Sequence, residues 1–181
     1  MSKTIVLTGM KHCGKSTQGR MLAEKLHRNF IDADDVIEQI YARKHNEKLS
    51  CREIFRKHGE TFFRKLEAEA VQFMMDNNDN QQIIAFGGGA VANPFMPENW
   101  RSLGVVVYLA ANPLVLYQRI EGRGLPPYLA GEPEPYKKFL EITAEREKSF
   151  NATADKIFQL NMQDSAGDNN SELMKFIATE I

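Results

Sequence analysis

The stretch that decides the fold is residues 4–17, T-I-V-L-T-G-M-K-H-C-G-K-S-T. Its first five residues are β-branched or apolar, which predicts a buried strand over residues 4–8. Apolar residues at helical spacing over residues 16–26 predict a helix. Between the two, residues 9–16 match the pattern G-x-x-x-x-G-K-[ST] in full. A strand, a glycine loop and a helix in this order predict a phosphate-binding P-loop.

The residue types in this loop explain how it would hold phosphate. Glycine lets the backbone curl so that successive N–H groups point at phosphate oxygens, and the helix that follows adds its positive N-terminal end. Lys15 is expected to reach the β- and γ-phosphates of ATP, and the Ser16 hydroxyl to bind Mg²⁺. A chance match is the alternative, and the flanking strand and helix argue against it. The predicted ATP-binding residues here are Gly9, Lys11, Cys13, Gly14, Lys15, Ser16 and Thr17.

Composition narrows the class of protein. The chain has 181 residues, of which 43% are hydrophobic and 26% charged, as expected for one soluble domain over residues 1–181. The net charge of −1 gives no reason to expect nucleic-acid binding. No apolar run is long enough to span a membrane. Two cysteines are too few for a disulfide scaffold and favour a reducing cytoplasm. We expect a cytoplasmic monomer.

Strand and helix patterns alternate along the rest of the chain. Such alternation predicts an α/β fold, a parallel sheet with helices on both faces in three layers. The expected strands are residues 29–31, 83–86, 105–109 and 157–160; the expected helices are 36–43, one capped by Ser50 and Glu53, 62–75, 113–119, 136–150 and 171–180, with a polar turn over 164–170.

Two polar motifs follow predicted strands, and ligands in parallel sheets bind at the carboxyl ends of the strands. Asp32 and Asp34 end one strand, and alternation would point both the same way. One carboxylate there can hold the water shell of Mg²⁺, and the other can deprotonate an acceptor hydroxyl. A solvated acidic turn, or a helix cap with Asp35 as the cap, explains them equally well. Gly87, Gly88 and Gly89 form the second motif and expose backbone N–H groups to a ligand, or make a flexible turn.

Several arginines are candidates for binding charge. Arg64 lies in an amphipathic helical pattern, while Arg119, Arg123 and Arg146 lie on or near the Gly/Pro-rich stretch 122–135. That stretch predicts a mobile loop able to close over ATP. For each arginine taken singly, a solvated surface charge is at least as common.

These motifs together resemble the shikimate kinase family, and the resemblance covers about residues 3–155. It runs through the P-loop, the following G-R and L-A-E-K-L, the segment F-I-D-A-D-D-V-I-E, the segment E-I-F-R-K-H-G-E-T-F-F-R-K-L-E and the motif F-G-G-G-A-V. The order and spacing of the motifs agree with the family. The resemblance implies a P-loop kinase fold with a substrate-binding helical region over about residues 35–76 and a mobile lid over about residues 120–136.

The resemblance also implies roles for single residues. Asp32 would help to place Mg²⁺ through water, and Asp34 would bind the ring hydroxyls of the acceptor and serve as the base. Arg119 would pack near the adenine. The carboxylate of the acid substrate would be held by Arg64, the backbone of Gly87, Gly88 and Gly89, and Arg146. The implied reaction transfers the ATP γ-phosphate to the 3-hydroxyl of shikimate, a step of aromatic amino acid biosynthesis.

The chain departs from the family pattern in the predicted lid. Pro126 stands where family members usually carry an arginine, and Arg123 is the nearby residue that would substitute for it in catalysis. The helix around Arg146 and the residue His12 also differ from the family pattern. Two alternatives therefore stay open, a kinase for another hydroxy acid of the gluconate type and a nucleotide-binding homologue with impaired catalysis.

Overall fold

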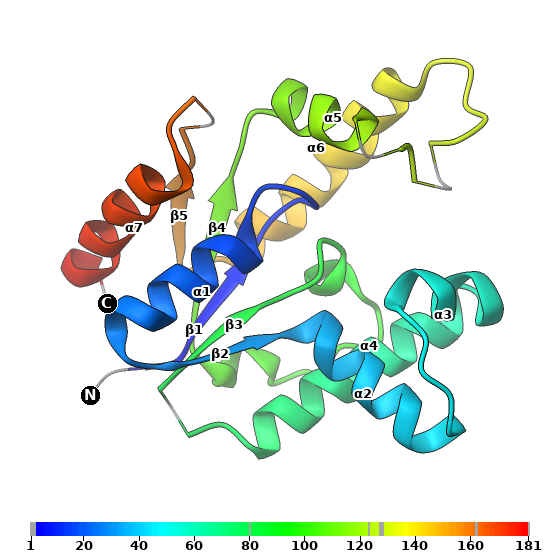
Figure 1. The fold of residues 1–181 in the computed structure, drawn as a ribbon, viewed down its shortest axis with the longest axis horizontal. Helices are drawn as coiled ribbons and strands as arrows, with labels where there is room; N and C mark the ends of the chain where they lie inside the picture. The colour runs from blue at the N-terminus through cyan, green and yellow to red at the C-terminus, as the bar shows by residue number, and fades with distance from the viewer. Residues whose placement is uncertain (1–2, 80, 123, 127–128, 162, 181) are drawn as a thin grey trace.

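A parallel sheet forms the centre of the molecule (Figure 1). The computed structural model describes residues 3–79, 81–122, 124–126, 129–161 and 163–180. Within these residues the strands are ordered β2-β3-β1-β4-β5, and every neighbouring pair is parallel. They are β1 (Ile5–Thr8), β2 (Asn29–Asp32), β3 (Gln82–Ala85), β4 (Val105–Ala110) and β5 (Lys156–Gln159). The predicted parallel sheet is confirmed.

Helices cover both faces of this sheet, as the alternating pattern predicted. Ile5 and Leu7 of β1 pack into one core with α1, α5, α6 and α7, while Val6 between them packs into a second core with α2, α3 and α4. The three-layer α/β/α class is therefore confirmed. The helices are α1 (Lys15–Leu26), α2 (Ala33–His45), α3 (Cys51–His58), α4 (Glu60–Asp76), α5 (Pro113–Glu121), α6 (Pro135–Thr153) and α7 (Ala166–Glu180), with short 3₁₀ turns η1 (Ala90–Ala92) and η2 (Trp100–Leu103).

Two helix starts show how capping sets the element bounds. Ser50 caps α3 as expected, because its hydroxyl accepts a hydrogen bond from the Glu53 N–H while the Glu53 carboxylate accepts from the Ser50 N–H. By contrast, α7 begins at Ala166, where the sequence predicted a polar turn. Ser165 accepts from the Asp168 N–H at 3.1 Å, so this Ser-x-x-Asp pattern starts the helix earlier.

The loops that follow β1, β2, β3 and β4 all leave the sheet at its carboxyl edge, because the strands are parallel. The predicted lid over residues 120–136 lies between α5 and α6. Residues 124–126 and 129–134 of it contain no helix or strand, and Arg123 lies outside the described residues. Closure of this loop stays a prediction.

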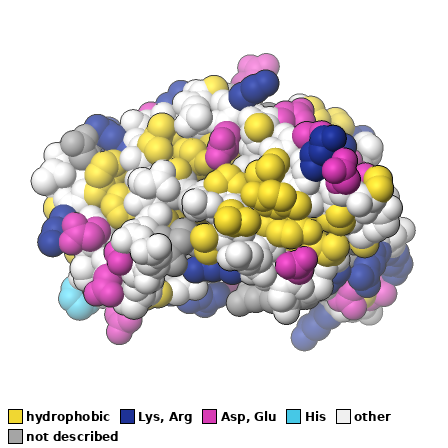
Figure 2. Space-filling view, turned by 90° about the horizontal axis from the view of Figure 1, so that it is seen from above, with side chains coloured by type: hydrophobic (Ala, Val, Ile, Leu, Met, Phe, Trp, Pro, Cys, Tyr) yellow, Lys and Arg dark blue, Asp and Glu magenta, His cyan; other side chains and the backbone are white. Residues whose placement is uncertain are grey.

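The surface seen from above in Figure 2 mixes charges of both signs around apolar patches. The large apolar side chains exposed on α5 and α6 are Leu114, Tyr136 and Leu140. Among the described helices, none combines the length and hydropathy that a membrane crossing needs.

Candidate active site

The P-loop connects β1 to α1 and has the curled backbone that phosphate binding requires. Gly9 has φ 142° and Gly14 has φ 103°, in the left-handed half of conformational space that glycine adopts without strain. A Cβ on Gly9 would lie 2.7 Å from the Leu109 carbonyl oxygen, so β4 leaves no room for a side chain there. The Lys15 ammonium is buried and donates hydrogen bonds of 3.0 Å to the carbonyl oxygens of Gly9 and Met10. The backbone of the P-loop therefore curves around the Lys15 ammonium and is held to it by these two hydrogen bonds.

Ser16 and Asp32 supply an oxygen pair suited to a hard cation. The Ser16 hydroxyl donates a hydrogen bond of 2.6 Å to Asp32 Oδ2, which joins the start of α1 to the end of β2. A hydroxyl and a carboxylate are oxygen ligands of the kind that Mg²⁺ prefers, directly or through water. The pair predicted to serve the metal therefore lies together at the P-loop.

The sequence pattern predicted that Asp32 and Asp34 lie in one extended segment, which would point both the same way. The prediction of one extended segment is wrong. The strand ends at Asp32, which caps α2 by accepting a hydrogen bond of 3.2 Å from the Asp34 N–H, while Asp34 lies in the first helical turn. The suggestion that Asp35 is the cap is therefore wrong. Asp34 still faces the glycine motif, because a Cβ on Gly87 would lie 3.4 Å from Asp34 Oδ1.

The environment of Asp34 favours its protonated form. Its pKa is raised to about 6, mainly because surrounding protein atoms displace water from the carboxylate. The negative charge of Asp32 adds to this effect, and so does that of Glu67, whereas Lys15 and Lys11 lower the pKa. The residue as a whole is solvent-exposed, so a proton can reach it. A carboxylate with this pKa can accept a proton near neutral pH.

Arg64 and the glycine motif are packed against each other. Arg64 lies on α4, its side chain is only 16% exposed, and a Cβ on Gly89 would lie 2.8 Å from its Nη2. A Cβ on Gly88 would lie 2.9 Å from the Lys11 backbone nitrogen. Gly88 therefore has no room for a side chain against the P-loop backbone, while Gly87 and Gly89 leave space for the side chains that arrive from α2 and α4. The structure places Arg64 at the site rather than on the open surface.

Glu67 is a site residue that the sequence reasoning missed. Its side chain is 4% exposed and accepts a hydrogen bond of 2.7 Å from Arg64 Nη1. It also accepts one of 2.9 Å from Asn93 Nδ2. A buried carboxylate is costly unless it is paired, so this pairing fixes the guanidinium in place. The available signal was the i, i+3 spacing of an acid after Arg64 on a helix.

The other residues predicted for the site make fewer contacts with the groups described above. Arg119 Nη1 donates a hydrogen bond of 3.3 Å to the His12 carbonyl oxygen, so Arg119 does lie beside the P-loop. His12 holds a positive φ of 66°. Arg146 is half-buried on α6, a helix that packs against η1 directly after the glycine motif. Cys13 in the loop is buried, whereas Thr17 in the first turn of α1 is exposed.

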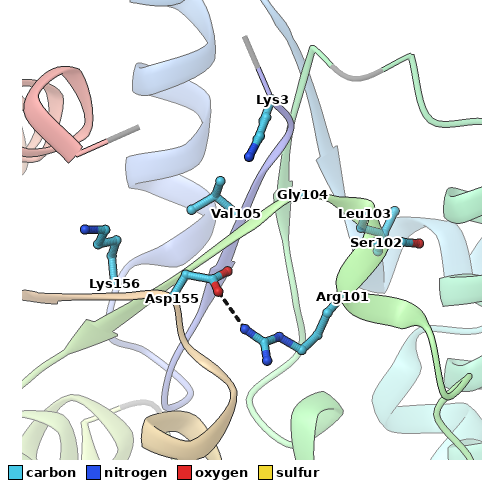
Figure 3. A pocket seen from close by; sticks show the side chains of 8 residues that line it. All are labelled: Lys3, Arg101, Ser102, Leu103, Gly104, Val105, Asp155 and Lys156. Carbon is cyan, nitrogen blue, oxygen red and sulfur yellow. Dashed lines mark hydrogen bonds and ion pairs between the residues drawn. The ribbon is translucent and has the colours of Figure 1, made fainter. Parts of the chain in front are cut away.

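A hollow of about 560 Å³ lies at the amino ends of β1, β4 and β5, away from all these groups (Figure 3). Lys3, Arg101 and Asp155 are among its lining residues. Asp155 accepts hydrogen bonds from Arg101 Nη2 at 2.6 Å and from the Val106 N–H at 2.9 Å. These bonds fasten the start of β5 to η2 and β4. Because the P-loop leaves the opposite edge of the sheet, this hollow is not the candidate active site.

The class of protein that these features indicate is a P-loop kinase, because a P-loop follows the central strand of a parallel sheet and an oxygen pair for a cation lies beside it. The half-buried Arg64 beside the glycine motif suits a small acid as the acceptor. The chain matches the model of the family described as "Shikimate kinase" over residues 11–180. It therefore belongs to the shikimate kinase family.

Individual relatives agree with this assignment. The chain is 41% identical to a shikimate kinase of Caldanaerobacter subterraneus subsp. tengcongensis, with 80% of each chain covered. It is 36% identical to a shikimate kinase of Alkaliphilus oremlandii, covering 86% of this chain and 88% of the relative. A shikimate kinase from Acinetobacter baumannii, solved in complex with shikimate, superposes with a TM-score of 0.82 and 29% identity, covering 98% and 93% of the two chains.

Proposed function

We propose that this protein transfers the γ-phosphate of ATP to the 3-hydroxyl of shikimate. The observation that carries the proposal is the convergence of Arg64, the glycine motif and Asp34 beside the P-loop. An arginine suits the carboxylate of the acceptor, and an aspartate suits its hydroxyl. The family relatives and the Acinetobacter baumannii complex with shikimate support shikimate as the acid.

On the acceptor side, Arg64 would bind the carboxylate of shikimate. Its guanidinium has five N–H donors, and Glu67 occupies Nη1, so donors remain for a ligand. Gly87, Gly88 and Gly89 would offer backbone N–H groups at close range. Arg146 on α6 would add a second cation for the same carboxylate. Helices within the region 35–76 would thus form the substrate-binding part of the domain.

On the donor side, the P-loop N–H groups would hold the β- and γ-phosphates. Lys15 would exchange its carbonyl partners for phosphate oxygens, and Arg119 would pack near the adenine. Ser16 and Asp32 would hold Mg²⁺, which supplies charge stabilisation to the transferring phosphoryl group when it is bound. The loop over 120–136, with Arg123, would act as the lid.

Asp34 would serve as the general base. In the transfer, the acceptor hydroxyl oxygen forms a bond to the γ-phosphorus while the bond to the bridging oxygen of ADP breaks. The hydroxyl proton passes to the Asp34 carboxylate.

All of these groups come from one chain, so a monomer would be sufficient for the reaction. Cys13 and Cys51 form no disulfide, which is compatible with the cytoplasm.

The acceptor assignment is tested by separating acid binding from ATP binding. Arg64→Ala should lower kcat/KM for shikimate by about 100-fold or more, because a charge-assisted contact to the acid is lost and Glu67 loses its cationic partner. The affinity for ATP, measured by calorimetry, should stay within about twofold. Arg56→Ala, which removes an exposed arginine on α3, is the matched control and should leave both quantities unchanged. Full activity of Arg64→Ala would refute the carboxylate contact.

A further inference from the structure

Lys11 is a P-loop residue predicted to bind ATP, but its side chain has been given no part in the transfer step. The other cations of the site are held by protein partners: Lys15 by carbonyl oxygens, Arg64 by Glu67 and Arg119 by the His12 carbonyl. Lys11, in contrast, is exposed, and within the described part of the chain its ammonium makes no hydrogen bond or ion pair. Its charge is therefore available to a ligand.

Lys11 lies where the P-loop, which would bind the phosphate donor, contacts the glycine motif at Gly88, which would bind the acceptor. We call this contact the junction. The backbone nitrogen and Cα of Lys11 lie 2.9 Å and 3.5 Å from the point where a Cβ on Gly88 would stand. The P-loop and the glycine motif thus touch at Lys11. At the neighbouring position of the motif, a Cβ on Gly87 would lie 3.4 Å from Asp34 Oδ1. Lys11 is therefore the P-loop residue that contacts the glycine motif, and this motif also faces the carboxylate expected to receive the proton.

Negative charge is concentrated at this junction, and a further cation would stabilise it. Asp32, Asp34 and Glu67 place three carboxylates around it. A transferring phosphoryl group spreads negative charge over three equatorial oxygens, and preorganised cations stabilise that charge. Among the described lid residues next to α5, positions 124–126 are Gly, Leu and Pro and carry no charge.

We propose that the Lys11 side chain is a catalytic cation that contacts an equatorial oxygen of the γ-phosphoryl group during transfer. The proposal rests on the proposed function and adds to it a residue for the transferring group itself. Lys11 keeps its proton throughout: the bond from phosphorus to the bridging oxygen of ADP breaks, the bond to the acceptor oxygen forms, and the hydroxyl proton passes to Asp34. The contact strengthens as charge moves onto the equatorial oxygens, so it acts on the rate rather than on binding.

The test compares Lys11→Met with Lys11→Arg, using the full chain. Lys11→Met should lower kcat by about 10- to 100-fold while the KM values for ATP and shikimate change by less than about threefold. Lys11→Arg should restore most of the rate, because it returns the charge. Lys25→Met, which removes an exposed lysine from the last turn of α1, is the matched control and should keep full activity.

A binding measurement separates a catalytic role from a structural one. Affinity for ADP with shikimate and aluminium fluoride, which imitates the transferring group, should fall in Lys11→Met by a factor similar to that in kcat. Affinity for ADP alone should not change. Unchanged kcat in Lys11→Met, or an equal loss of ADP affinity and rate in both Lys11 variants, would overturn the proposal. Absence of any shikimate-dependent turnover in the unmodified protein would instead refute the proposed function.

Discussion

At the scale of single residues, the site depends on pairs of groups rather than on isolated side chains. Ser16 is joined to Asp32, and Arg64 is joined to Glu67, each by a short hydrogen bond. In the proposed function, the first pair binds the metal cation and the second pair binds the carboxylate of the acceptor. The partner in each pair keeps a charged or polar group oriented before the ligand arrives, which lowers the cost of binding.

Asp34 is expected to titrate at a higher pH than an ordinary aspartate. Its pKa is raised to about 6, so it holds a proton at pH values where an ordinary aspartate has lost its own. The base form is therefore present above pH 6 and is lost as the pH falls through 6. A ¹³C NMR titration of the ligand-free protein should show one aspartate carboxyl with a midpoint of about 6.

Two variants assign that signal. Asp34→Asn should remove the titration with the raised midpoint, and turnover should fall with it because the proton acceptor is gone. Asp35→Asn, one residue further along α2 and exposed, should leave both in place. If every aspartate carboxyl in the unmodified protein titrated near pH 4, its ordinary range, the account of Asp34 would be wrong.

At the scale of elements, local sequence patterns predicted most of the helices and strands. The strand of residues 4–8, the glycine loop and the following helix are in place to within a residue, because propensity, patterning and capping agree there. The start of α7 was predicted too late because its first turns are polar: the local cap by Ser165 was overlooked, and the burial of Asn170 depends on the distant residue Gln18. Glu67 was missed for the same reason: its burial depends on Asn93 and on the fold around it.

The contact between α7 and α1 shows how such distant partners act. Asn170 is fully buried on α7, and its amide donates hydrogen bonds of 2.9 Å to the backbone and side-chain oxygens of Gln18 on α1. The Gln18 amide in turn donates to the Ala166 carbonyl oxygen at 3.0 Å, at the start of α7. Polar residues that look like a turn in the sequence therefore fasten this helix to the helix of the P-loop.

Asn170→Ala should consequently destabilise the protein. Removing the amide leaves two buried Gln18 oxygens without this donor, and we expect the free energy of unfolding to fall by about 2 to 3 kcal/mol. Urea unfolding followed by the fluorescence of Trp100, the single tryptophan, measures it. Lys175→Ala, on an exposed position of the same helix, should change it by less than about 0.5 kcal/mol. Equal stability of the two variants would contradict the role of this network.

At the scale of the whole molecule, the strand order explains why the proposed donor and acceptor sites lie at one edge of the sheet. The P-loop follows the central strand β1, and the acidic loop and the glycine motif follow β2 and β3 on one side of it. Parallel strands then bring all three to one edge, as the sequence pattern predicted. The sequence could not show that Arg64 on α4 would pack against this edge, because that contact depends on how α4 lies across the sheet; the family resemblance supplied it.

The most direct test of the account is the rate of ADP release from ATP and Mg²⁺ by the purified protein with a panel of hydroxy acids. We expect turnover that depends on shikimate, with a higher kcat/KM for shikimate than for gluconate or other polyhydroxy acids. A higher kcat/KM for another acid would contradict the proposed acceptor. No acceptor-dependent ADP release with any acid would contradict the assignment of this site as a working kinase.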